Sequence, residues 1–318
     1  MIAETESTVH PSGAWDSAYH APVLLPEVVR VLEGARQVLD GTLGGGGHTA
    51  ALLAAGVRVT ALDRDPEAIA AVATRLAEFV RRGQLQVVLG NYADLASAVA
   101  AEQRYDGILL DLGVSSHQVD DAARGFSFRE GAPLDMRMGP DAVQDAATFL
   151  NSADERELAW VFREYGDERR ALRLAREVGR RRVTRPFATS DDLVGAIRAT
   201  LGPRSGAPDF ARLFQAVRIA VNDELAGLER ALPQLRDRLN PQGVFAVIAY
   251  HSGEDRIVKH AFRDWSTACT CPPRQPVCTC GGVALGQLVT RRAVRPSADE
   301  VARNPRARSA RLRAWRAA

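Results

Sequence analysis

Short apolar runs alternate with helical patterns through the first third of the chain. Four of these runs predict strands, at residues 37–40, 58–63, 85–89 and 107–112. Continuous apolar runs of this length are typical of strands that are buried on both faces of a parallel sheet. Helical patterns separate the later runs, at residues 66–80 and 94–101. This order of strands and helices predicts a doubly wound α/β sheet.

The alternation stops after residue 117 and resumes after residue 210. Between these points the spacing of apolar residues predicts helices, and Leu158, Val161 and Phe162 fall on one helical face. The pattern then predicts a helix at 214–239, a strand at 243–250 and a weak last strand at 310–315. We therefore expect a flexible leader (1–18), an α/β domain (19–117 and 211–318) and a helical domain inserted into it (118–210).

Composition places the chain among ordinary globular proteins. Of its 318 residues, 46% are hydrophobic and 25% are charged, which excludes a fully disordered chain. No apolar run approaches the roughly 18 residues that a transmembrane helix needs, and the polar N-terminus has no signal-peptide core. We therefore expect a cytoplasmic protein that does not bind a membrane. The sequence leaves the oligomeric state open.

A glycine-rich loop follows the first predicted strand and leads into a helix at 48–55. Glycines let the backbone approach a ligand closely, and the first turn of a helix offers free N–H groups. Asp63 ends the next strand, where a carboxylate can accept both hydroxyls of an adenosine ribose. A tight turn with a helix cap is the simpler alternative.

The glycine loop alone does not identify its ligand. Residues 45–50 satisfy the fingerprint of dinucleotide sites, and methyltransferases that use S-adenosylmethionine place a similar loop and acidic residue in the same fold. A P-loop is excluded because no Gly-Lys-Ser/Thr follows the glycines. The loop therefore leaves a nucleotide-dependent oxidoreductase and a methyltransferase open.

Polar groups also follow the later predicted strands. Tyr92 follows the third strand, Asp111 ends the fourth with Ser115 and Ser116 after it, and His251 follows the fifth. In an open α/β sheet, ligands bind beyond the carboxyl ends of the strands. Each residue has a structural alternative, such as helix capping for Ser115 or a buried packing contact for His251. Their occurrence at one edge of the sheet nevertheless indicates a site.

Several longer motifs resemble those of the ribosomal RNA small-subunit methyltransferase H family, also called MraW. They are DGTLGGGGH (40–48), DRDP (63–66), LDLGVSS (110–116), DDAARGFSF (120–128), PLDMRM (133–138), HSGEDRIVK (251–259) and NPRARS (304–309). They occur in the order typical of the family and cover most of the chain. The chain departs from the family pattern at Tyr250, where Phe is common, and at Gly253, where Leu is common.

The resemblance implies a class I S-adenosylmethionine-dependent methyltransferase fold with an inserted helical domain for substrate recognition. The implied reaction is methylation of the exocyclic N4 of a cytosine in the decoding region of 16S ribosomal RNA, within the small ribosomal subunit. The donor-binding positions that it implies are Gly46, Gly47, His48, Asp63, Tyr92, Asp111 and Gln118.

Transfer to an exocyclic amine requires a group that holds the amine in line with the methyl group and accepts its N–H. Asp111, Ser115, Ser116 and His251 are the candidates, and Asp111 is the first choice because a carboxylate can contact both donor and amine. Methylation at carbon 5 is disfavoured because it needs a placed cysteine nucleophile. All four cysteines follow the His251 motif in sequence, beyond the last strand end that is predicted to contribute to the site.

Arginines gather in two parts of the sequence. If residues 169–180 are helical, then Arg169, Arg173, Arg176 and Arg180 share one face, opposite Leu174 and Val178. Nine arginines and only two acidic residues also lie between residues 291 and 316, although the net charge of the chain is only +2. A solvated surface is the simpler explanation, but this pattern also predicts contacts with RNA phosphates.

The four cysteines form one cluster, Cys269, Cys271, Cys278 and Cys280. Four thiolates at this spacing can hold zinc, although the one-residue gaps are tighter than the usual two. Reduced thiols in a loop are the alternative, and disulfides are improbable in the cytoplasm.

The enzyme hypothesis has a rival of another class. A non-catalytic RNA-binding ribosome assembly factor could retain the same pocket without transferring a methyl group. Assays of methyl transfer and of cofactor binding distinguish this rival and the nucleotide-dependent oxidoreductase from the methyltransferase.

Overall fold

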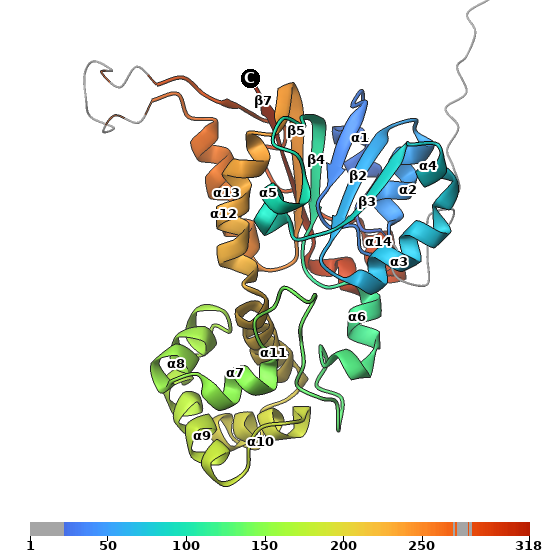
Figure 1. Cartoon of the computed structure of the whole chain (residues 1–318). Helices are drawn as coiled ribbons and strands as arrows, with labels where there is room; N and C mark the ends of the chain where they lie inside the picture. The colour runs from blue at the N-terminus through green and yellow to red at the C-terminus, as the bar shows by residue number, and fades with distance from the viewer. Residues whose placement is uncertain (1–21, 270, 272–278, 280–281) are drawn as a thin grey trace, which may run out of the picture.

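The computed structural model describes residues 22–269, 271, 279 and 282–318. A mixed sheet with helices on both faces forms one part, and a group of helices lies beyond the carboxyl ends of its parallel strands (Figure 1). The proposed leader, residues 1–18, lies outside the described residues.

The sheet has seven strands, and its order identifies the fold class. In spatial order they are β3 (Leu85–Leu89), β2 (Arg58–Asp63), β1 (Gln37–Asp40), β4 (Tyr105–Asp111), β5 (Leu239–Ala249), β7 (Arg311–Ala317) and β6 (Gly286–Leu288). Strands β1 to β5 are parallel, and β7 pairs antiparallel with both β5 and β6. The predicted α/β sheet and its weak last strand are confirmed.

Each central strand supplies side chains to two different hydrophobic cores. In β1, Val38 joins the core on one face and Leu39 joins the core on the other. In β4, Leu109 lies in the first core, whereas Ile108 and Leu110 lie in the second. Successive side chains of a strand point to opposite faces, so burial of both faces requires an unbroken apolar run.

Helices cover both faces of the sheet. The first core takes residues from α1 (Leu25–Val31), α2 (Gly47–Ala54), α3 (Pro66–Arg75) and η3 (Pro305–Ser309). The second core takes residues from α5 (Leu95–Ala98), α12 (Glu224–Arg236) and α13 (Ser252–Trp265). The remaining elements here are α4 (Ala77–Arg81), η1 (Tyr92–Asp94) and α14 (Ala298–Arg303). The helix predicted at 66–80 is therefore two helices, and the helix predicted at 94–101 is shorter.

The helical part has a separate hydrophobic core, which runs from Leu134 to Val221 and includes the predicted face of Leu158, Val161 and Phe162. This core takes residues from α7 (Ala146–Ser152), α8 (Glu155–Glu164), α9 (Ala171–Thr184), α10 (Ser190–Leu201) and α11 (Ala207–Asn222), while α6 (Ser116–Asp120) and η2 (Ala122–Arg124) precede it in the chain. Helix α11 packs with this core along its length. The domain boundaries at residues 118 and 210 stay a prediction.

The prediction of a single helix at 214–239 was wrong. Helices α11 and α12 are separated at Asp223, whose φ of 51° and ψ of 39° place it in the left-handed region. Aspartate adopts this conformation more readily than most residues other than glycine. The break lies between α11 on the helical part and α12 beside the sheet, where the chain returns to the sheet (Figure 1).

Candidate active site

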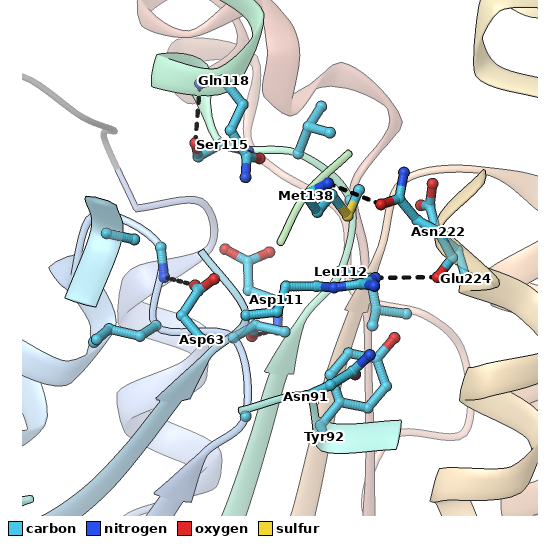
Figure 2. Close-up of a pocket in the computed structure, with 18 of the residues that line it drawn as sticks. Asp63, Asn91, Tyr92, Asp111, Leu112, Ser115, Gln118, Met138, Asn222 and Glu224 are labelled. Atoms are coloured by element: carbon cyan, nitrogen blue, oxygen red, sulfur yellow. Dashed lines mark hydrogen bonds between the residues drawn. The ribbon is translucent and has the colours of Figure 1, made fainter. Parts of the chain in front are cut away.

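A pocket lies at the carboxyl ends of the parallel strands, where β1 and β4 are neighbours. Such a point, where the chain crosses from one half of the sheet to the other, is where open α/β sheets bind ligands. The loops after β1 to β5 line the pocket, and Met138 and the junction of α11 with α12 close its opposite side (Figure 2).

The glycine loop brings bare backbone to one wall of the pocket. Gly46 has a φ of 71° and precedes α2, whose first turn has no side-chain cap. A Cβ at Gly46 would lie 2.9 Å from a methyl group of Val72, and one at Gly47 would lie 2.9 Å from Pro22. Any residue larger than glycine would therefore clash at these two positions. Since no side chain caps the first turn of α2, its N–H groups can bind an anionic or polar ligand.

Asp63 ends β2, and two backbone N–H groups fix its carboxylate. Gly44 donates to Oδ2 over 2.7 Å (Figure 2). Asp65 donates to Oδ1 over 2.9 Å. Burial raises the pKa of Asp63 to about 6, although both hydrogen bonds favour the ionised form. Each oxygen keeps a lone pair for a ligand, so the carboxylate can accept two hydroxyl groups.

Asn91 and Tyr92 follow β3 and line the wall beside Asp63. The side chain of Asn91 accepts the backbone N–H of Ala93 over 2.9 Å, which fixes the start of η1. Burial raises the pKa of Tyr92 well above its usual range, so its phenol is neutral. The ring can flank a planar base without adding charge.

Asp111, which ends β4, lies between His48 and Tyr250. The hydroxyl of Tyr250 donates to Oδ1 of Asp111 over 2.9 Å, and Nδ1 of His48 lies 3.6 Å from Oδ2. Nε2 of His48 lies 3.0 Å from the carbonyl oxygen of Val23, which can only accept, so this nitrogen carries the proton. Burial lowers the pKa of His48. Burial therefore disfavours the charged form of this imidazole.

Ser115 and Gln118 form a capping box at the start of α6. Gln118 donates its backbone N–H to Oγ of Ser115 over 3.2 Å, and its side-chain oxygen accepts the backbone N–H of Ser115 over 3.0 Å (Figure 2). The Gln118 amide also donates to Asp65 over 2.9 Å. Both residues line the pocket, while Ser116 is the first residue of the helix. Ser115 therefore caps the helix, as the structural alternative predicted, and it also lines the pocket.

His251 is a helix cap in this structure. Its Nδ1 accepts the backbone N–H groups of Gly253 and Glu254 over 3.2 and 3.4 Å at the start of α13. Among the described residues, the pocket lining includes Tyr250 and Glu254 but not His251. A catalytic role for His251 stays a prediction, and the geometry favours Asp111 over it.

The sequence argument missed the side of the pocket opposite the glycine loop. This side takes Met138 from the inserted region, and Asn222, Asp223 and Glu224 from the junction of α11 with α12. The pair Asn222-Asp223 inside a helical pattern was a usable signal, since both residue types tolerate the left-handed region.

The predicted arginine stripe lies on α9, on the helical part. Arg173, Arg176 and Arg180 are exposed and Leu174 and Val178 are buried, as expected, although α9 begins at Ala171 and Arg169 precedes it. Two stripe residues are paired with carboxylates, Arg176 with Glu155 over 3.0 Å and Arg180 with Glu177 over 2.8 Å. Only part of the stripe is therefore available for phosphate contacts, and RNA binding by it stays a prediction.

The cysteine cluster is only partly described. Cys278 and Cys280 lie outside the described residues, whereas Cys269 and Cys271 lie within them. In the part of the chain that the structure describes, no three histidine, cysteine or acidic side chains are grouped to hold a metal. Zinc therefore has no support in the structure. Within the same residues, no helix is long and apolar enough to cross a membrane.

Comparison with known proteins agrees with this geometry. Residues 17–318 match the model of the MraW methylase family. The chain belongs to the MraW methylase family. A ribosomal RNA small subunit methyltransferase H from Gemmatimonas aurantiaca is 66% identical over 309 residues, which cover 97% of this chain and 98% of that protein. A methyltransferase of the same name from Heliobacterium mobile is 46% identical over 93% of this chain and 97% of its own. The predicted family and fold class are thus confirmed.

Proposed function

We propose that this methylase transfers a methyl group from S-adenosylmethionine to N4 of a cytosine in the decoding region of 16S ribosomal RNA. The names of the relatives support an RNA of the small ribosomal subunit as substrate. The observation that carries the proposal is the placement of two fixed carboxylates, Asp63 and Asp111, in one pocket with the open glycine loop. One carboxylate suits a ribose, and the other suits an amine.

The described residues fit an adenosine-containing donor. Asp63 has the free lone pairs that two ribose hydroxyls need, and Tyr92 offers a neutral ring beside it. Gly46 and Gly47, which have no room for a Cβ beside Val72 and Pro22, line the pocket, and Gln118 lines it from α6. We infer that these residues, with His48 and Asp111, hold the donor. When bound, the donor supplies the reactive methyl group.

Asp111 is the residue that we infer acts on the acceptor. The lone pair of a cytosine amine is delocalised into the ring, so the site must accept an N–H and orient the nitrogen. Tyr250 donates to Oδ1 of Asp111, and Nδ1 of His48 lies beside Oδ2. The negative charge of the carboxylate also stabilises the positive charge that develops on the nitrogen during transfer. The hydroxyl of Ser115 is a second candidate for this contact.

Chemistry at carbon 5 of cytosine fits this pocket less well. That reaction needs a thiolate that attacks the ring. Within the described residues no cysteine lines the pocket, and Cys269 and Cys271 follow the end of α13. The exocyclic amine is therefore the acceptor that these side chains favour.

Transfer of a radiolabelled methyl group to small ribosomal subunits tests this function. The proposal expects label in the RNA that depends on S-adenosylmethionine and on the enzyme. A non-catalytic assembly factor would bind subunits without transferring label. A nucleotide-dependent oxidoreductase would bind a nicotinamide dinucleotide in calorimetry and would not bind S-adenosylmethionine.

Reversing the charge of Arg169 and Arg173 to glutamate is expected to weaken binding to small subunits and to flatten its salt dependence. Within the described residues neither arginine forms a salt bridge with a carboxylate, so each can release counterions from a phosphate. The double reversal of Arg176 and Arg180 to glutamate is the matched control, because Glu155 and Glu177 already pair with these arginines, and its effect should be smaller. An unchanged salt slope in filter binding by the variant of Arg169 and Arg173 would show that the stripe is only solvated.

A further inference from the structure

A loop of the inserted region forms part of the pocket wall. Residues 136–141 reach the carboxyl ends of β2 and β3, where Met138 lines the pocket and is only 7% exposed (Figure 2). Met136 has a φ of 60°, which a residue other than glycine adopts only when its surroundings hold it. The contacts that hold this loop are the basis of the inference.

Asp141 anchors one end of the loop to the sheet. Its two carboxylate oxygens accept Nε and Nη2 of Arg64 over 3.0 and 2.7 Å, a bidentate pair. The side chain of Asn91 donates to Oδ2 of the same carboxylate over 2.8 Å. Arg64 follows Asp63 in sequence, and Asn91 precedes Tyr92. Asp141 therefore fixes the neighbours in sequence of Asp63 and Tyr92, the two residues that we infer contact the adenosine.

Asn222 anchors the other end of the loop to α11. Its buried side chain accepts the backbone N–H of Met138 over 2.8 Å and donates to the carbonyl oxygen of Met136 over 2.7 Å. Arg64 joins the two anchors, because its Nη1 donates to the carbonyl oxygen of Asn222 over 3.0 Å. At Gly139 the backbone approaches Arg64 so closely that a Cβ would lie 2.2 Å from the carbonyl oxygen of Arg64.

We propose that Asp141 is a positioning residue for the methyl donor. It is not itself among the residues that line the pocket, whereas its partners Arg64 and Asn91 and the loop residue Met138 are. Through these contacts Asp141 holds the wall in place before the donor arrives. A wall that is already ordered does not have to be ordered on binding, and this preorganisation raises affinity. The proposal rests on the use of the donor and not on which base is methylated.

Asp141→Asn tests the proposal, because asparagine has nearly the same shape and lacks the charge. Calorimetry with S-adenosylmethionine and with S-adenosylhomocysteine should show an affinity lower by about three- to tenfold, as expected when a charge-assisted pair no longer orders a site. Without donor, residues 136–141 should exchange hydrogen faster in the variant than in wild type, because the wall is no longer held in place before binding. Thermal unfolding should change little, since the Asp141 side chain is 38% exposed.

Two further variants separate positioning from general stability. Glu155→Gln is the matched control, since it removes an exposed ion pair with Arg176 in the helical part and should leave donor affinity unchanged. Asp141→Glu keeps the carboxylate and should recover most of the affinity. Wild-type affinity in Asp141→Asn, or an equal loss in Glu155→Gln, would overturn the positioning role. No binding of the donor by wild type would overturn the donor assignment as well.

Discussion

Replacing Asp111 with alanine is expected to abolish methyl transfer to small ribosomal subunits. The change removes the carboxylate that we infer accepts the amine N–H, and it also disturbs donor binding beside His48. Loss of a charged group that acts in the transition state typically costs about 100-fold or more in rate. Labelled methyl transfer measures the loss, and circular dichroism shows whether the fold is kept.

Two companion variants make the result at Asp111 specific. Asp111→Asn keeps the shape of the side chain and removes its charge, so it should be almost as inactive. Tyr250→Phe keeps the ring and removes only the hydroxyl that binds Oδ1, so it should lose less activity. An active Asp111→Ala enzyme would contradict the assignment and would shift the role to His251 or to Ser115 and Ser116.

Asp63→Ala is expected to weaken binding of S-adenosylmethionine by roughly 1.5–3 kcal/mol, or about 10- to 150-fold. The ribose hydroxyls lose a charged acceptor that the N–H groups of Gly44 and Asp65 hold in place. Calorimetry measures the affinity, and circular dichroism should stay native because Asp63 ends a strand at the pocket. Unchanged affinity would refute the role of Asp63.

The same carboxylate should make donor binding depend on pH. Because the folded protein raises the pKa of Asp63 to about 6, the carboxylate is ionised above this pH and accepts charge-assisted hydrogen bonds. As the pH falls through about 6, protonation removes these bonds and affinity should fall. Asp40 also has a pKa raised to about 6, by burial, so Asp63→Asn is the control. Its profile should be flatter, and a profile like that of wild type would assign the titration to Asp40.

The sheet was predictable because its signals are local. Strands β1, β2 and β4 are buried on both faces, so each shows an apolar run that can be recognised without its neighbours. The break between α11 and α12 was not predicted, because both helices are amphipathic and only the conformation of Asp223 separates them. A helical period alone does not show where a helix bends away.

The site was predictable only where a motif carries it. The glycine loop, Asp63 and Asp111 follow strands, and strand ends meet at one edge whatever the rest of the chain does. The wall built from Met138, Asp141 and Asn222 depends on contacts between residues far apart in sequence, such as Arg64 with Asp141. No local pattern specifies such pairs. The capping role of His251 was equally hidden, since the side chain could have pointed into the pocket.

The most direct test of the account is the identity of the methylated nucleoside. Small ribosomal subunits that lack the modification are incubated with the enzyme and S-adenosylmethionine, and the 16S RNA is digested to nucleosides for mass spectrometry against synthetic standards. The account predicts N4-methylcytidine from a single position in the decoding region, and none with Asp111→Ala. A carbon-5-methyl product would contradict the mechanism, and a ribose-methyl product would contradict the assignment of the acceptor to a base.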